Sequence, residues 1–248
     1  MIMYTNPKSV IDSYDKAAES YLKWRLDPTM EIFIREKEAI CKLIPNVSGC
    51  KILDLGCGPG VYSAIVSLQG AQVCSIDASS GMITQANDFL KSQCAQSTLI
   101  LGTADALPFK SSCFEGIIAS FLLENLPDID HALLEIARVT KPNGFMLFSM
   151  NHPFMTFLIK IEVMEDKSLR FVPGDYFRKT SFNVRLALSN DRPEILHLHH
   201  RTFARYLNSI AASGVSIERI EEVEVFQRSD HQYLAGLPFV MVVKCRKM

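Results

Sequence analysis

The sequence lacks an excess of charge of either sign. Its 248 residues include 26 lysines and arginines and 27 aspartates and glutamates, which leaves a net charge of −1. A protein that binds nucleic acid mainly by neutralising phosphates carries a clear excess of basic residues, so this balance argues against that class. A local basic patch is still compatible with it.

Paired cysteines and long apolar runs are also missing. The seven cysteines are odd in number, and no two have C-x-x-C spacing, which disfavours a zinc ribbon or a disulfide framework and favours a reducing compartment. The longest apolar stretches, such as 239–243, have the length of a strand, and the N-terminus has no apolar segment of a signal peptide. We therefore expect a cytoplasmic protein that does not span a membrane.

The composition is that of a folded globular protein. Hydrophobic residues make up 48% of the chain and charged residues 21%, which is too apolar for a disordered protein. A chain of this length buries enough surface to fold without disulfides or metal ions. The length favours one large domain, or one domain with a small cap.

Apolar segments of strand length alternate with helical segments along the middle of the chain. Helices at 9–26 and 29–43 come first. Strands are predicted at 51–55, 72–77, 98–102, 114–120 and 145–150, a turn at 142–144, and helices at about 61–69, 82–90 and 130–140. This alternation predicts a doubly wound parallel sheet with helices on both faces, in which ligands bind beyond the carboxyl ends of the strands. A helix at 201–212 and strands at 218–226 and 238–245 follow.

The alternation stops over residues 152–198. This aromatic-rich segment directly follows a predicted strand end, so we expect it to form a cap or strand insertion over the ligand-binding edge. The alternative is a surface elaboration with a small core of its own.

A glycine-rich loop follows the first strand of the sheet. Gly56, Gly58 and Gly60 lie between that strand and a helix, which lets a ligand approach the backbone and the free amides of the helix N-terminus. The dinucleotide pattern G-x-G-x-x-G fails at Val61, and Asp54 would repel a pyrophosphate. A carboxylate at that place suits a ligand with an ammonium or sulfonium group. The alternative is a tight connection without a ligand.

Two more carboxylates follow strands. Asp77 ends the second strand, where it can accept hydrogen bonds from both hydroxyls of a ribose, or instead cap the next helix. Asp105 follows the third strand, where it can accept from the amino group of an adenine, or instead stabilise the turn before Leu107 and Pro108.

Together these motifs resemble those of the class I S-adenosylmethionine-dependent methyltransferases, in particular the small-molecule type. Residues 54–60 match the first motif of that family, Asp77 its ribose-binding acid, and Ala104, Asp105 and Ala106 its adenine segment. The match is specific over about 50–151, weaker over 1–49 and 199–248, and absent over 156–195. The family implies a Rossmann-like, seven-stranded, mostly parallel sheet with a reversed last strand, and an N-terminal helix that folds over the cofactor.

The resemblance implies a single methyltransferase domain over 1–248. Its parts would be a helical lid (1–49), a cofactor-binding core (50–151), the cap insertion (152–198), and a helix with closing strands (199–248). The implied cofactor is S-adenosylmethionine, with S-adenosylhomocysteine as product. The residues expected to bind it are Tyr21, Asp54, Gly56, Cys57, Gly58, Gly60, Asp77, Ala78, Met82, Ala104, Asp105, Ala106 and Phe121. Tyr14 is a further candidate contact from the lid.

Methyl transfer from a sulfonium needs alignment and exclusion of water more than acid–base chemistry. The candidates for catalytic groups on the acceptor side are His152, just past the fifth strand, and His200, with Glu124 and Asn125 facing the same edge. Structural roles are the alternative for each of them. The histidines near position 200 have no matching carboxylate spacing, so we expect no metal site.

The sequence favours a small-molecule acceptor over nucleic acid. Amino-methylating enzymes of nucleic acids carry an Asn/Asp-Pro-Pro-aromatic motif after the fourth strand, where this chain reads Ser-Phe-Leu-Leu-Glu-Asn over 120–125. A similar Asn-His-Pro-Phe at 151–154 follows the fifth strand instead. Three alternatives remain: a non-catalytic cofactor- or partner-binding module, a carboxyl methyltransferase acting on a carrier-protein-bound acyl group, and a nicotinamide-dependent oxidoreductase, which Asp54 and Val61 disfavour.

Overall fold

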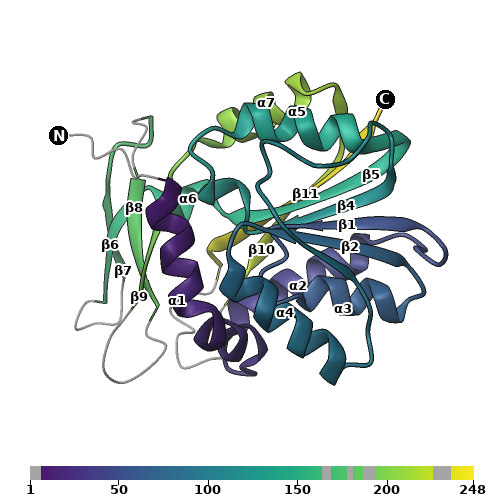
Figure 1. Ribbon diagram of the computed structural model, residues 1–248. Helices are drawn as coiled ribbons and strands as arrows, with labels where there is room; N and C mark the ends of the chain where they lie inside the picture. The colour runs from purple at the N-terminus through teal and green to yellow at the C-terminus, as the bar shows by residue number, and fades with distance from the viewer. Residues whose placement is uncertain (1–6, 164–168, 178–180, 187–193, 226–235) are drawn as a thin grey trace.

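The computed structural model describes residues 7–163, 169–177, 181–186, 194–225 and 236–248, and its centre is a seven-stranded sheet (Figure 1). The sheet has the order β10-β11-β5-β4-β1-β2-β3. Its strands are β1 (Lys51–Leu55), β2 (Gln72–Asp77), β3 (Thr98–Leu101), β4 (Phe114–Ser120), β5 (Thr140–Asn151), β10 (Val215–Glu224) and β11 (Pro238–Lys247). β11 pairs antiparallel with both neighbours, whereas β1 to β5 pair in parallel. The predicted doubly wound sheet with a reversed last strand is confirmed.

One strand begins earlier than predicted. β5 starts at Thr140, which pairs with Phe114, and the register then shifts so that Gly116 pairs with Phe145. The turn expected at 142–144 is therefore an irregularity inside a longer strand. Asn143 accommodates it with a φ of 62°, a left-handed conformation that asparagine tolerates better than most residues.

Helices cover both faces of the sheet (Figure 1). On one face lie α2 (Glu31–Leu43), α3 (Val61–Leu68) and α4 (Ser80–Ser92), and on the other lie α5 (Ile129–Val139) and α7 (Phe203–Ala212). Neighbouring residues of β1 pack on opposite sides: Ile52 joins the cluster under α2 and α3, and Leu53 the cluster under α5 and α7. Burial on both faces explains why these strands are continuously apolar.

The N-terminal helix α1 (Pro7–Leu26) is not part of either layer (Figure 1). It packs against α4 on one side and against β9 (Glu194–His199) on another. Ala17 of α1 is fully buried, and Leu196 of β9 packs in the same cluster. None of the described helices is both long and apolar enough to span a membrane.

The described part of the insertion forms two hairpins after the short helix α6 (Pro153–Thr156). β6 (Leu158–Val163) pairs with β7 (Leu169–Pro173), and β8 (Ser181–Leu186) pairs with β9, both antiparallel. The expected strand insertion is thus present. Residues 164–168, 178–180 and 187–193 of the insertion, and the loop at 226–235 between the closing strands, lie outside the described residues.

Candidate functional site

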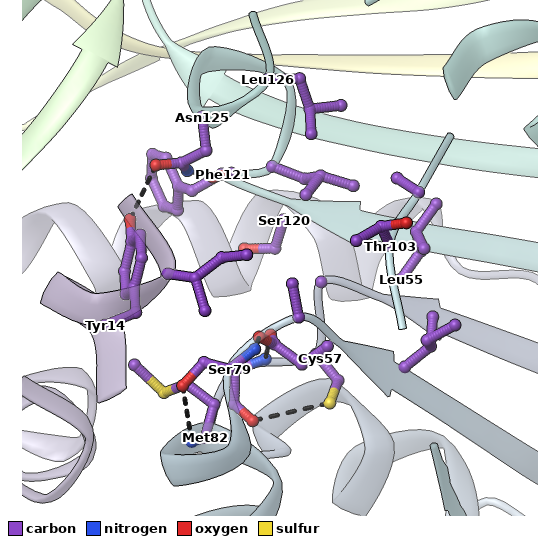
Figure 2. Close-up of a pocket in the computed structure, with 18 of the residues that line it drawn as sticks. Tyr14, Leu55, Cys57, Ser79, Met82, Thr103, Ser120, Phe121, Asn125 and Leu126 are labelled. Atoms are coloured by element: carbon purple, nitrogen blue, oxygen red, sulfur yellow. Dashed lines mark hydrogen bonds between the residues drawn. The ribbon is translucent and has the colours of Figure 1, made fainter. Parts of the chain in front are cut away.

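A cavity of about 270 Å³ lies at the carboxyl ends of the parallel strands, between the sheet and α1 (Figure 2). The loops after β1, β2, β3 and β4 form one wall, and α1 forms the other. Ligands of doubly wound sheets bind at this edge. The residues of α1 that line the cavity are Val10, Ile11, Tyr14, Tyr21 and Arg25.

The three glycines after β1 have left-handed backbones for different reasons. A Cβ atom on Gly56 would lie 2.8 Å from Leu122 Cδ1, and one on Gly60 would lie 3.2 Å from Ala86 Cβ. A Cβ atom on Gly58 would meet nothing nearer than the Tyr21 ring, at 4.0 Å. Gly58 therefore faces open space inside the cavity, whereas Gly60, which does not line it, allows α3 and α4 to pack closely.

Asp77 is held against this loop by backbone amides. Its Oδ2 accepts from the amide of Gly58 at 2.8 Å, and its Oδ1 accepts from the amide of Ser79 at 2.9 Å. Burial raises the pKa of this carboxyl, and these amide donors oppose the rise. Ser79, not Asp77, caps α4, since its hydroxyl accepts from the amide of Met82. The Asp77 carboxylate thus lines the cavity in a fixed orientation.

Asp54 lies deeper, and only 1% of it is exposed. Its Oδ2 accepts from the Ser63 hydroxyl at 2.5 Å, and Ser63 contacts Ser75 Oγ at 2.7 Å. Burial raises the pKa of Asp54 to about 6. This carboxylate still reaches the cavity, next to Gly56 and Cys57.

Most of the other expected cofactor contacts also reach the cavity. Ala78, Met82, Ala104, Asp105 and Phe121 line it, from the ends of three different strands. Ala106, like Gly60, is not among the lining residues. The binding roles of all these residues stay predictions, but the fold gathers the set around one space.

The wall made by α1 carries two tyrosines and a buried cation. The Tyr14 hydroxyl donates to Asn125 Oδ1 at 3.0 Å (Figure 2), and burial raises its pKa well above the ordinary value. Burial likewise raises the pKa of Tyr21 to about 12. Both therefore stay protonated near neutral pH and act as hydrogen-bond donors or apolar surfaces.

Arg25 and Glu36 form a buried ion pair beside the cavity. Arg25 Nη2 lies 3.5 Å from Glu36 Oε2, and the guanidinium lies 4.5 Å from the centre of the Phe33 ring. Nη1 of Arg25 has no hydrogen-bond partner among the described residues. Glu36 also accepts hydrogen bonds from the hydroxyls of Tyr62, Ser120 and Ser149.

Sequence reasoning missed both members of this pair. Arg25 falls on the apolar stripe of the first helix, with Tyr14, Ala17 and Tyr21, and a charged residue in that position is a signal for a buried partner. Glu36 is likewise fully buried within the second helix.

The two histidines predicted to act on the acceptor lie outside the lining of this cavity. His152 Nε2 contacts Glu222 Oε1 at 2.8 Å, its Nδ1 accepts from the amide of Phe154, and burial lowers its pKa. His200 Nδ1 contacts Thr156 Oγ1 at 2.7 Å, and its Nε2 contacts the Tyr176 carbonyl oxygen at 2.9 Å. The His152 contact ties the start of the insertion to β10, and the His200 contacts tie the end of β9 to two other parts of the insertion, which fits the structural alternative for both residues.

The described part of the insertion does not line the cavity either. The hairpin strand β9 covers α1 from outside, and α1 itself closes the ligand-binding edge. Across the described ranges, no three His, Cys, Asp or Glu side chains form a group suited to a metal ion.

Asn125 and Glu124, which follow β4, point in different directions. Asn125 lines the cavity, whereas Glu124 is not among the lining residues. Glu124 Oε1 accepts from the backbone amide and the side-chain amide of Asn151, and Oε2 has no partner among the described residues. Burial raises the pKa of Glu124 to about 7. Glu124 thus lies behind the lining, and its charge contributes to raising the pKa of Tyr14 and Tyr21.

The sequence is similar to a family model and to several known proteins. Residues 53–148 match the family model "Methyltransferase domain". An uncharacterized protein of Haemophilus influenzae is 28% identical over 256 residues, which cover 98% of each chain. A malonyl-[acyl-carrier protein] O-methyltransferase of Erwinia billingiae is 30% identical over 144 residues, and a demethylmenaquinone methyltransferase of Thermobifida fusca is 32% identical over 142 residues. Those two alignments cover 58% and 56% of this chain, and 54% and 59% of the relatives.

The fold has a close counterpart among solved structures. A protein of Listeria monocytogenes, described as a putative S-adenosylmethionine-dependent methyltransferase, superimposes with a TM-score of 0.72 at 21% identity, over 87% of this chain and 99% of that one. The glycine loop, Asp77 and the adenine segment all lie within the matched residues. Residues 53–148 therefore match the methyltransferase domain, and the chain shares its overall fold with a solved structure described as an S-adenosylmethionine-dependent methyltransferase.

Proposed function

We propose that this protein transfers a methyl group from S-adenosylmethionine to a small-molecule acceptor. The observation that carries the proposal is the pairing of the open face of Gly58 with the fixed carboxylate of Asp77 in one cavity. A backbone without a side chain at the cavity wall, beside an oriented carboxylate, suits a nucleoside that approaches the loop closely and whose ribose hydroxyls need an acceptor.

The lining residues fit the three parts of this cofactor. Asp77 would accept from the ribose hydroxyls, and Asp105 from the adenine amino group, with Met82 and Ala104 beside the base. Asp54 would attract the positively charged end of the molecule. The unpartnered Nη1 of Arg25 is a cationic donor that suits the carboxylate of the methionine part.

The chemistry needs few groups from the protein. When bound, S-adenosylmethionine would supply a methyl group from its sulfonium: the carbon–sulfur bond would break as the bond to the acceptor atom forms, its electron pair would stay on sulfur, and a proton on the acceptor atom would leave to water. The protein aligns the acceptor in line with that bond and excludes water. The cavity suits both conditions, because α1 covers it and the aromatic side chains of Tyr14, from α1, and Phe121, just after β4, lie on one side of it (Figure 2).

The two named relatives act on different acceptors, a malonyl carrier protein and demethylmenaquinone. Each is similar to little more than half of this chain, and the matched parts contain the cofactor-binding core. The similarity therefore supports the methyl donor more than any one acceptor, and the charge of the cavity is the better guide to the acceptor.

Calorimetric titration with S-adenosylhomocysteine and with S-adenosylmethionine tests the proposal. One-to-one binding of either ligand is expected, and Asp77→Ala should weaken it by about 1–3 kcal/mol because the ribose hydroxyls lose their acceptor. Asp88→Ala, a change to an exposed aspartate of α4, is the matched control. Failure of the folded protein to bind either ligand would overturn the proposal.

A further inference from the structure

The acceptor side of the cavity contains one polar pair in apolar surroundings. The Tyr14 hydroxyl and Asn125 Oδ1 lie 3.0 Å apart there, and Figure 2 shows the two side chains, from α1 and from the loop after β4, pointing toward one another. The same two segments also contribute apolar residues to the cavity lining, Val10 and Ile11 from α1, and Leu122 and Leu126 from the segment after β4. A ligand bound beside the pair therefore meets apolar side chains as well as these hydrogen-bonding groups.

The orientation of the Asn125 amide is fixed by its partners. Its Nδ2 donates to the backbone carbonyl of Phe121 at 2.7 Å, so the amide nitrogen is already used within the turn after β4. Oδ1 consequently points toward α1, where the Tyr14 hydroxyl donates to one of its two lone pairs, and Asn125 is among the residues that line the cavity. The second lone pair needs a donor, and a hydroxyl or amine on a ligand supplies one, whereas a carboxylate cannot.

The charge of the cavity also favours an uncharged hydroxyl or amine ligand over a carboxylate. Within the described lining, one guanidinium faces four carboxylates, with the imidazole of His131 as a further titratable group; the carboxylates belong to Asp54, Asp77, Asp105 and Asp128. The guanidinium, that of Arg25, already lies 3.5 Å from Glu36. An anionic acceptor would thus enter a space whose described lining carries more carboxylates than cationic side chains, and the protein would offer it no guanidinium or ammonium beyond Arg25.

From this geometry we propose that the acceptor is an uncharged molecule with an apolar body and a hydroxyl or amine donor, which Asn125 Oδ1 binds. The proposal rests on the proposed function, since it assigns the part of the cavity that the methyl donor leaves free. It makes Asn125 the residue that determines specificity, and it excludes carboxylates as acceptors.

A matched pair of probes tests it: 1-naphthol and 1-naphthoate share a ring and differ in donor and charge. Each is titrated by calorimetry into the full chain saturated with S-adenosylhomocysteine at neutral pH. Naphthol should bind at least tenfold more tightly than naphthoate. Asn125→Leu should lower the naphthol affinity by about tenfold, the effect of one lost hydrogen bond in a buried site.

Two variants separate recognition from a general disturbance. Tyr14→Phe keeps the ring and leaves Asn125 Oδ1 in place, so the naphthol affinity should fall less than in Asn125→Leu, because the hydrogen bond from naphthol to Oδ1 survives. Asn87→Leu makes the same substitution at an asparagine of α4 that does not line the cavity. It should change neither the affinity for naphthol nor the affinity for naphthoate.

The outcomes distinguish this proposal from the proposed function. If S-adenosylhomocysteine binds but naphthoate binds as tightly as naphthol, or neither binds, the acceptor assignment is wrong and the cofactor assignment stands. Equal losses in Tyr14→Phe and Asn125→Leu would also contradict the role of Oδ1. If S-adenosylhomocysteine itself does not bind, both proposals fail.

Discussion

The carboxylate of Asp15 joins the N-terminal helix to the start of α4. Its Oδ1 accepts from the Ser79 hydroxyl at 2.6 Å and from the amide of Gly81 at 2.8 Å. The helices approach so closely that a Cβ atom on Gly81 would lie 2.7 Å from the backbone oxygen of Asp15. Asp15 thereby holds the helix that closes the cavity.

Loss of this contact should weaken ligand binding but not abolish it. Asp15→Ala is expected to lower the affinity for S-adenosylhomocysteine several-fold, because α1 must then be ordered by the ligand. Asp12→Ala, an exposed aspartate one turn earlier, should leave the affinity unchanged. Titration calorimetry on both variants checks this, and equal affinities would show that α1 does not need the Asp15 contact.

A side chain at Gly58 should block the cavity itself. Gly58→Val places its branches in the open space opposite Tyr21, so binding of S-adenosylhomocysteine should be lost. Gly49→Val is the matched control, since Gly49 also has a positive φ, 76°, with no atom within 4 Å of its Cβ position. In both variants the new side chain strains a left-handed backbone by about 1–2 kcal/mol. The two variants therefore differ only in whether the side chain blocks the cavity. Normal binding by Gly58→Val would mean that the loop is not part of the site.

Removing one member of the Arg25–Glu36 ion pair should lower the free energy of unfolding. Arg25→Met leaves the fully buried Glu36 without its cation, which is expected to cost about 3–5 kcal/mol in the free energy of unfolding. The double variant Arg25→Met, Glu36→Met should recover part of that loss. Urea denaturation measures both. Additive losses in the double variant would show that the two groups do not interact.

Glu124 should make stability fall as pH rises. Burial raises its pKa from 4.5 in the unfolded chain to about 7 in the folded protein, so between these values the folded state binds more protons than the unfolded state. The free energy of unfolding contributed by this group therefore declines across that window and is constant above it. Glu124→Gln keeps an oxygen for Asn151 and should flatten the decline, measured by denaturation at pH 5 and pH 8. The same slope in both proteins would contradict a buried, unpaired carboxyl.

Sequence reasoning predicted the sheet and the cofactor edge because both depend on local pattern. Continuous apolar strands, the glycine loop and Asp77 are short-range signals, and the fold brings them to one edge by topology alone. The acceptor side depends on contacts between distant residues. Tyr14 meets Asn125 across 111 positions, and no periodicity in either segment indicates that pairing.

The predicted histidines also show that contacts between distant residues cannot be inferred from local sequence pattern. His152 does follow β5 as predicted, but its ring turns toward Glu222 of β10, away from the cavity, which position along a strand cannot reveal. The insertion was correctly placed after this strand. Its contact with the outer side of α1 depends on Leu196, a residue that sequence reasoning had no means of assigning to that surface.

The most direct test of the account is calorimetric titration of the purified protein with S-adenosylhomocysteine, run side by side with Gly58→Val and Gly49→Val. We predict one-to-one binding to the parent protein and to Gly49→Val, and none to Gly58→Val. Absence of binding to a folded parent protein, or equal binding to all three, would contradict a methyl-donor site in the cavity between α1 and the glycine loop.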